Sequence, residues 1–141
     1  MGGAEAHEFT LIILTPDKCF FSGSAQEIIF NTPKGRVGVM AGHMPMVAAV
    51  VEDTVDILVD GAWKTAAISQ GFAEISRNMA EFFVDTVEWA DEIDAVRARE
   101  ALERARARLK SEHSHLEHMH AQAAMARALA RLKATGGLES D

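Results

Sequence analysis

The sequence predicts a β-sandwich of about ten strands followed by an antiparallel hairpin of two α-helices. Residues 1–90 contain short apolar or alternating runs between turn signals, at the roughly 8–12-residue spacing typical of a sandwich or barrel. Residues 91–135 contain no Gly or Pro, are rich in Ala, and repeat apolar side chains at near-helical spacing. Net charge changes at the same point, from twelve acidic and five basic residues before position 91 to seven acidic and nine basic residues over 91–134. We therefore expect a sandwich over 1–90, a helical hairpin over 91–135 and a flexible tail over 136–141.

The strand predictions depend on apolar runs and on the turn residues between them. Thr-Pro-Asp at 15–17 and Thr-Pro-Lys-Gly at 32–35 are turn sequences, and Asp60-Gly61 is a strong hairpin signal. Apolar and polar residues alternate over 55–60, as expected of a strand with one face in water. The predicted strands are residues 9–14, 19–21, 27–31, 36–40, 46–51, 54–59, 63–68, 71–76 and 79–87.

The helix predictions depend on capping residues. Asp91 can cap the first helix, and Asp94 then adds a second acid to its positive first turn. Ser-His-Leu-Glu at 114–117 is a capping box that starts the second helix, and Gly136-Gly137 ends it. The connection over 111–114 is short, so the two helices should be antiparallel. The apolar side chains predicted to pack are Ile93, Val96, Ala101, Leu102, Ala105 and Leu109 on the first helix, and Leu116, Met119, Ala123, Met125, Ala126, Leu129, Ala130 and Leu132 on the second.

Composition excludes several classes of protein. The single cysteine, Cys19, rules out an internal disulfide and suits a reducing compartment. The longest apolar runs, such as residues 44–51, are far shorter than a membrane span. The acidic sandwich should avoid nucleic acid and acidic lipid. We expect no nucleic-acid partner, and membrane association only through a partner protein.

His43 is the one candidate for catalysis. It lies in a glycine-bearing loop, but the sequence has no Gly-x-Ser-x-Gly, Cys-x-x-Cys or His-Glu-x-x-His pattern. A histidine that stabilises a turn or an interface is the favoured interpretation, and a small hydrolase that uses His43 is the alternative. We predict no catalytic residue.

Four histidines cluster near the connection between the helices: His113, His115, His118 and His120. They can be interpreted as a metal site, as a pH-sensitive group, or as exposed polar side chains at a turn. No convincing set of additional ligands completes a metal site, so we predict none and favour the exposed turn.

Several arginines can share one end of the hairpin. Asp94, Arg97 and Ala98 lie at i, i+3 and i+4, and Arg127 and Arg131 at i and i+4. An antiparallel hairpin brings Arg97 near Arg127 and Arg131, with Ala98 leaving room for a flat ring. Guanidinium groups suit phosphate oxygens, and the Asp94 carboxylate can accept a hydrogen bond from an exocyclic amine.

Arg104 lies seven residues beyond Arg97 and should stay near the same face. The alternative interpretation of all these arginines is a solvated charged face, balanced by Glu100 and Glu103. Spacing alone leaves both interpretations open.

A set of short motifs appears in a fixed order in the first half of the chain. These are Leu-Thr-Pro-Asp at 14–17, Phe-Ser-Gly at 21–23, Gly-Arg-Val-Gly-Val-Met-Ala-Gly-His-Met-Pro at 35–45, and Gly-Phe-Ala-Glu at 71–74. Followed by an alanine-rich hairpin, this order resembles the epsilon subunit of bacterial F-type ATP synthases, over residues 9 to 133. Ala41 stands where that family usually carries Pro.

The resemblance implies a ten-stranded sandwich and two helices in a non-catalytic subunit of the rotating central stalk, which couples proton flow to ATP synthesis. It implies contact with the gamma subunit and the c-ring, and a peripheral location on the cytoplasmic face of the bacterial inner membrane. It also implies a hairpin that can leave the sandwich, contact the beta and alpha subunits, and resist ATP hydrolysis. The residues expected at the interface with the stalk are Gly38, Met40, Gly42, His43, Met44 and Pro45.

Residues 93–98 match the family's nucleotide-binding pattern, Ile/Leu-Asp-x-x-Arg-Ala. The resemblance therefore implies regulatory ATP, with no cofactor required. A stand-alone ATP-sensing module is the alternative function. The expected nucleotide site comprises Glu88, Ile93, Asp94, Arg97, Ala98, Arg104, Arg127 and Arg131.

The physical character of the hairpin agrees with this expectation. Alanine buries little apolar area per residue, so the hairpin should hold the sandwich weakly and a second conformation should be accessible. A nucleotide between the helices would favour the folded form by its differential affinity alone. The basic first helix could engage an acidic patch on another subunit.

Overall fold

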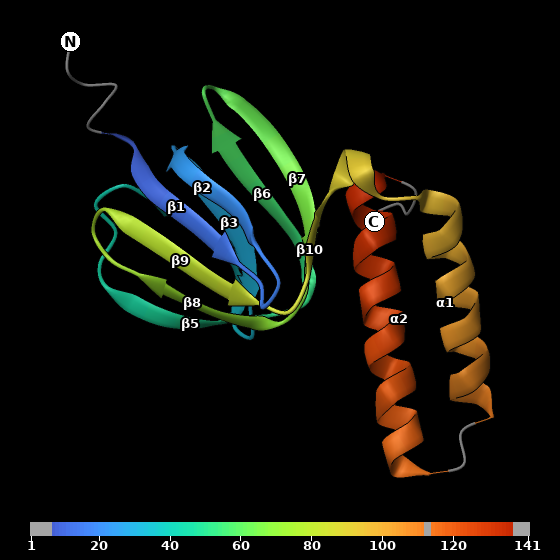
Figure 1. The fold of residues 1–141 in the computed structure, drawn as a ribbon. Helices are drawn as coiled ribbons and strands as arrows, with labels where there is room; N and C mark the ends of the chain where they lie inside the picture. The colour runs from blue at the N-terminus through green and yellow to red at the C-terminus, as the bar shows by residue number, and fades with distance from the viewer. Residues whose placement is uncertain (1–6, 112–113, 137–141) are drawn as a thin grey trace.

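The computed structural model describes residues 7–111 and 114–136. Ten strands precede two helices (Figure 1). The strands are β1 (Phe9–Leu14), β2 (Cys19–Ala25), β3 (Glu27–Thr32), β4 (Gly35–Met40), β5 (Met46–Val50), β6 (Asp53–Val59), β7 (Ala62–Ile68), β8 (Gly71–Ile75), β9 (Met79–Val84) and β10 (Val87–Trp89). A short 3-10 helix, η2 (Ala90–Glu92), leads into α1 (Ala95–Lys110), which is followed by α2 (His115–Thr135).

Two five-stranded sheets pack face to face. One has the order β2-β1-β9-β8-β5 and the other β10-β7-β6-β3-β4, and β1 and β9 form the one parallel pair among the described strands. Their inner faces share a core in which Phe30 and Phe82 meet edge to face, with ring centroids 5.0 Å apart. The predicted β-sandwich and helical hairpin are therefore confirmed.

The predicted strand over 79–87 is wrong, because the chain changes sheets within it. β9 ends at Val84 and β10 begins at Val87 in the other sheet. Thr86 lies between them, where its N–H donates to Ser69 Oγ at 2.8 Å and its carbonyl accepts from Ser69 N at 2.9 Å. These two bonds hold the crossing against the end of β7.

Gly71, the first residue of β8, allows a close approach between strands. It pairs with Val84 of β9. A Cβ atom at position 71 would overlap the carbonyl oxygen of Phe83, so this register tolerates no side chain there.

The cap of the first helix differs from the prediction. Asp94, not Asp91, is the N-cap of α1, and its Oδ1 accepts from Arg97 N at 3.1 Å. Asp91 lies in η2, which turns the chain away from the sandwich before the helix starts. Both acids are good caps, and the added turn decides between them.

The second helix begins and ends as predicted. Ser114 caps it by accepting from Glu117 N at 3.1 Å, and Gly136 ends it with a positive φ of 79°. Gly137, His113 and the tail over 137–141 lie outside the described residues.

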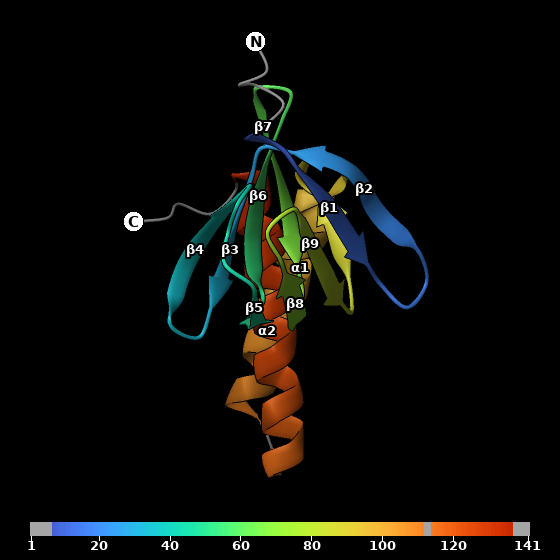
Figure 2. The ribbon, with the colours of Figure 1, turned by 90° about the vertical axis from the view of Figure 1, so that its left-hand side faces the viewer.

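The hairpin has an apolar core separate from that of the sandwich. Its buried members are Ile93, Ala98, Leu102, Ala128, Ala130 and Leu132, together with Ala67 of β7. α2 lies against the sheet that contains β6 and β7, whereas α1 packs mainly on α2 (Figure 1). Figure 2 shows, from a second direction, that the end of the hairpin opposite the sandwich contact extends past the strands.

Three large apolar residues predicted to pack are instead exposed, as is the smaller Ala123. Val96 and Leu116 are each 61% exposed, and Met119 is 49% exposed. Helical spacing identified the helices correctly, but no neighbouring element covers these three positions in the described part of the chain. Among residues 7–111 and 114–136, no helix combines the length and apolar character needed to cross a bilayer.

Candidate functional site

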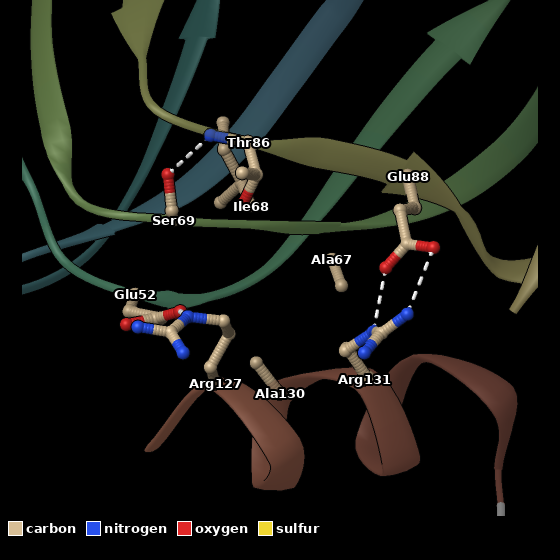
Figure 3. Close-up of a pocket in the computed structure, with 9 residues that line it drawn as sticks. All are labelled: Glu52, Ala67, Ile68, Ser69, Thr86, Glu88, Arg127, Ala130 and Arg131. Atoms are coloured by element: carbon tan, nitrogen blue, oxygen red, sulfur yellow. Dashed lines mark hydrogen bonds and ion pairs between the residues drawn. The ribbon is translucent and has the colours of Figure 1, made fainter. Parts of the chain in front are cut away.

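The C-terminal half of α2 carries three basic side chains that reach acidic side chains of the sandwich. Figure 3 shows two of them, Arg127 and Arg131. Arg131 forms a two-pronged pair with Glu88 of β10, with Nε–Oε1 at 2.6 Å and Nη2–Oε2 at 3.1 Å. Lys133 Nζ lies 3.1 Å from Oδ1 of Asp53, the first residue of β6. Parallel N–H···O bonds between a guanidinium and a carboxylate fix geometry as well as charge, so Arg131 and Glu88 define the position of α2 on the sheet.

The third contact is longer. Arg127 Nε lies 3.8 Å from Glu52 Oε2, between β5 and β6. Burial raises the pKa of Glu52 above its usual 4.5, and the charge of Arg127 opposes this shift without cancelling it. The attraction between Arg127 and Glu52 therefore does not offset the unfavourable free energy of burying the Glu52 carboxylate.

Asp53 differs from its neighbour. Burial raises its pKa, but hydrogen bonds from Thr54 N and Lys133 and the positive charges of Lys133 and Arg36 outweigh burial, so the pKa of Asp53 lies below 3.8. Its ionised form is favoured in the folded chain.

A hollow of about 290 Å³ lies between α2 and the sheet. Glu52, Glu88, Arg127 and Arg131 line it together with small residues such as Ala67 (Figure 3). Each charged group at this hollow has an opposite charge beside it.

A second hollow of about 230 Å³ lies between the two helices. Arg104, Arg108, Arg127 and Arg131 surround it, and alanines of both helices form the rest of its wall. Arginine side chains around a surface of small side chains suit a ligand with several negative oxygen atoms, such as a polyphosphate. In this conformation the guanidinium of Arg131 is paired with Glu88 and that of Arg127 lies beside Glu52.

Four residues of the expected nucleotide site line these two hollows: Arg127 and Arg131 line both, Glu88 lines the first and Arg104 lines the second. The other four lie elsewhere. Asp94 caps α1, Ile93 and Ala98 are buried in the helical core, and Arg97 lines neither hollow. Ala98 is fully buried, so it leaves no open space for a ring in this conformation.

Sequence reasoning did not identify Glu52, Asp53, Lys133 or Arg108 as site residues. Arg108 follows Arg104 at i+4, a spacing that could have identified it. The pairing of Lys133 with Asp53 spans 80 positions, and no local pattern marks it.

The expected stalk interface is an exposed loop at one end of the sandwich. Met40 ends β4 with 58% of its surface exposed, and Met44 is 78% exposed. Gly42 has a φ of 86°, and its N–H donates to Arg77 O at 2.7 Å. His43 Nδ1 lies 2.7 Å from its neighbour's carbonyl oxygen, Met44 O, a contact within the turn.

Pro45 continues this exposed region onto the outer face of the β2-β1-β9-β8-β5 sheet. It borders a hollow of about 430 Å³ with Val47 and Met79, which are 73% and 37% exposed. Gly38, by contrast, lies on β4 in the other sheet. An exposed loop with large apolar side chains, next to Val47 and Met79 on the sheet, is typical of a protein–protein contact. Glu74 and Glu81 add negative charge beside them.

Three of the four histidines near the hairpin connection lie in the described part of the chain, and these three form no recognisable ligand set. His115, His118 and His120 belong to the first two turns of α2, and His113 lies outside the described residues. Within the described part of the chain, no three side chains of His, Cys, Asp or Glu are grouped so as to hold a metal ion.

Comparisons with known proteins match both parts of the chain. Residues 8–90 match the family model for the ATP synthase, Delta/Epsilon chain, beta-sandwich domain, and residues 91–136 match that for the ATP synthase, Delta/Epsilon chain, long alpha-helix domain. The ATP synthase epsilon chain of Ruminiclostridium cellulolyticum is 44% identical over 127 residues, which cover 90% of this chain and 95% of that relative. The ATP synthase epsilon chain of Prochlorococcus marinus is 34% identical over 129 residues, covering 89% and 97%.

Solved structures share the fold. A chain in the Euglena gracilis mitochondrial ATP synthase, from a structure of OSCP, F1 and the c-ring, has a TM-score of 0.79 at 23% identity, and the match covers 90% of this chain and 80% of that one. A chain in the central stalk and c-ring of the Tetrahymena thermophila mitochondrial ATP synthase has a TM-score of 0.62 at 13% identity, with 90% and 96% covered.

Proposed function

The chain belongs to the ATP synthase epsilon chain family, whose members are non-catalytic subunits of the central stalk, and from that premise we propose that its two-helix hairpin restrains ATP hydrolysis by the assembled motor. One observation carries the proposal. The hairpin has its own apolar core and contacts the sandwich chiefly through α2, so it can move as a unit without exposing the sandwich core.

The sandwich is the part that we propose binds the rotor, through the gamma subunit and the c-ring. The exposed Met40 and Met44 of the loop and the exposed Val47 beside it on β5 support this proposal. The solved relatives are chains of complexes that include a c-ring. Membrane association would then come through these partners, at the cytoplasmic face of the bacterial inner membrane.

The hairpin is the part that we propose contacts the beta and alpha subunits when it extends. Most of the basic residues of α1 are well exposed, and Arg106 pairs with Glu103 of the same helix at 3.4 Å. α1 packs mainly on α2, so its outer face remains accessible to an acidic partner.

ATP is the regulatory ligand that we propose for the groove between the helices. Arg104, Arg108, Arg127 and Arg131 converge there on a hollow of about 230 Å³. A polyphosphate bound by both helices would hold them together and favour the folded hairpin by its differential affinity.

The test of the regulatory role is the hydrolysis rate of the assembled complex with and without residues 91–141. We expect the truncated complex to assemble and to hydrolyse ATP faster, because the restraint is removed. A complex carrying the full chain with Glu100→Gln, an exposed substitution on α1, serves as the control and should keep the original rate. An unchanged rate in the truncated complex would refute the regulatory role.

The stalk assignment is tested separately by co-purification. The chain should be recovered with the gamma subunit and the c-ring, and a Met44→Asp substitution in the exposed loop should weaken that association. Recovery of the chain alone, at normal expression, would contradict the proposed rotor contacts.

A further inference from the structure

The contact between α2 and the sandwich contains little apolar surface. Among the described residues, Ala67 is the one member of the buried helical core that the sandwich supplies. It packs with Ala130, and the hollow of about 290 Å³ beside it leaves part of the interface unfilled. Because alanine buries little area, apolar contact alone should hold the hairpin weakly.

Charged contacts flank this small apolar patch on both sides. Arg131 and Lys133 are two residues apart, so they project about 200° from each other around the axis of α2. One reaches Glu88 on β10 and the other reaches Asp53 on β6. Thr54, the residue after Asp53, and Glu88 both pair with Ala67, on opposite sides of β7, so the two acids lie either side of the strand on which α2 rests.

We propose that Arg131–Glu88 and Lys133–Asp53 form an ion-pair latch that holds the hairpin on the sandwich and that rising ionic strength releases. Its regulatory meaning rests on the proposed role of the hairpin in restraining hydrolysis. The latch itself is a property of this chain and can be tested without the motor.

The exposure of the latch makes it sensitive to salt. The Arg131 and Glu88 side chains are 34% and 35% exposed, and those of Lys133 and Asp53 are 41% and 24% exposed. Partly exposed pairs are screened by mobile ions, and the screening length falls from about 10 Å at 0.1 M salt to about 3 Å at 1 M. Apolar contacts respond in the opposite direction or not at all, so salt separates the two ways of holding the hairpin.

Arg127 and Glu52 form the third contact across this interface but are not part of the latch. Their charged atoms are 3.8 Å apart, and burial destabilises the Glu52 carboxylate more than the charge of Arg127 stabilises it. Neutralising Glu52 should therefore not weaken docking, whereas neutralising Glu88 or Asp53 should.

The experiment measures the distance between sandwich and hairpin in the full chain. Cys19 is exposed on β2 and accepts one spin label, and an introduced Ala107→Cys on the exposed side of α1 accepts the second. Pulsed electron–electron double resonance between the two labels then gives the populations of docked and undocked hairpin at 0.1 M and 1 M NaCl. We expect the docked-to-undocked ratio to fall roughly threefold or more between these salt concentrations.

Four substitutions sharpen the test. Glu88→Gln and Asp53→Asn should each lower the docked-to-undocked ratio at 0.1 M NaCl by roughly 1.5-fold to fivefold. Glu52→Gln and Glu100→Gln are matched controls and should not lower it. Circular dichroism confirms that each variant is folded.

A charge exchange gives the strongest evidence. Arg131→Glu alone should release the hairpin, and combining it with Glu88→Arg should restore most of the docked population, because the pair is re-formed with reversed polarity. A docked population that is insensitive to salt, to Glu88→Gln and to Asp53→Asn would overturn the latch.

The latch and the regulatory role can fail independently. If these distances confirm the latch but the truncated complex hydrolyses ATP at an unchanged rate, only the proposed regulatory role is refuted. If the truncated complex hydrolyses ATP faster but docking of the hairpin does not respond to salt, only the proposed latch is refuted.

Discussion

The rings of Phe20 on β2 and Trp89 on β10 lie 4.6 Å apart, centroid to centroid, and this contact joins edge strands of the two sheets. Lys64 lies on β7, the strand that pairs with β10, and its Nζ is 4.2 Å from the centroid of the Trp89 ring. Trp89 directly precedes η2, so the aromatic contact holds the point at which the chain leaves the sandwich.

Removal of this ring should destabilise the sandwich. Trp89→Ala is expected to lower the free energy of unfolding by about 2 kcal/mol, because a half-buried indole and its ring contacts are lost. Urea denaturation followed by circular dichroism measures the change. Trp63→Ala is the matched control, because Trp63 is 50% exposed and should lose less than about 0.5 kcal/mol. Equal losses from the two substitutions would show that the Phe20–Trp89 contact contributes nothing specific.

A methyl group at position 71 should be poorly tolerated. Gly71→Ala places a Cβ atom against the Phe83 carbonyl oxygen, so β8 and β9 must separate locally. We expect a loss of about 1–3 kcal/mol in unfolding free energy. At Gly23 a Cβ atom would meet only ring atoms of Phe21, at 3.7 Å, so Gly23→Ala should change stability by less than about 0.5 kcal/mol. A similar loss from both substitutions would point to backbone entropy or strand propensity in place of the close approach.

The charge of Asp53 should make stability depend on pH. Its folded-state pKa lies below 3.8, so the carboxylate contributes stability above pH 3.8, and this contribution is lost as pH falls through the folded-state value. Asp53→Asn should therefore cost up to about 1 kcal/mol at pH 7, and the difference from the unsubstituted chain should shrink toward zero near pH 2. Parallel urea titrations of the two chains at pH 7, 5, 3.5 and 2 give this difference.

Glu52 should show the opposite sign. Its folded-state pKa is raised above 4.5, so the charged form opposes folding at neutral pH and the penalty disappears as the carboxyl protonates in acid. Glu52→Gln should thus be neutral or slightly stabilising at pH 7. A loss of stability like that of Asp53→Asn would contradict the distinction between these neighbouring acids.

The arginine groove between the helices predicts where a nucleotide binds. Arg104→Gln should weaken ATP binding by the chain about tenfold or more, because a charged hydrogen-bond donor is removed from the groove. Isothermal calorimetry measures the affinity. Arg99→Gln removes an exposed charge of α1 that does not line the groove and should have little effect. Equal losses would indicate non-specific attraction, and no binding by the unsubstituted chain would remove the nucleotide proposal.

The strands were predictable where turn residues separate them, and less so where the chain changes sheets without a Gly or Pro. Residues 79–87 were predicted as one strand, yet the crossing at Thr86 depends on hydrogen bonds with Ser69, just after β7. The sequence likewise predicted Asp91 as the cap of the first helix, whereas the 3-10 turn over Ala90–Glu92 delays the start of the helix and makes Asp94 the cap.

The site was predictable in part. Spacing brought Arg127 and Arg131 together on one helix, and the resemblance included Glu88. Arg131 and Glu88 are 43 positions apart, so their pairing is a tertiary contact that local sequence patterns do not predict. Periodicity likewise marks Val96 and Leu116 as apolar faces of helices, but it does not say which faces another element covers.

The geometry of the hairpin amplifies motion. α2 has 21 residues, about 31 Å at the usual rise, and it touches the sheet through its C-terminal half. A rotation of roughly 10° about the short turn at Ala90–Glu92 would carry the far end of this lever through an arc of about 5 Å. A small rotation of the hairpin next to β10 therefore produces a large displacement at the far end of α2, where Leu116 and Met119 are exposed.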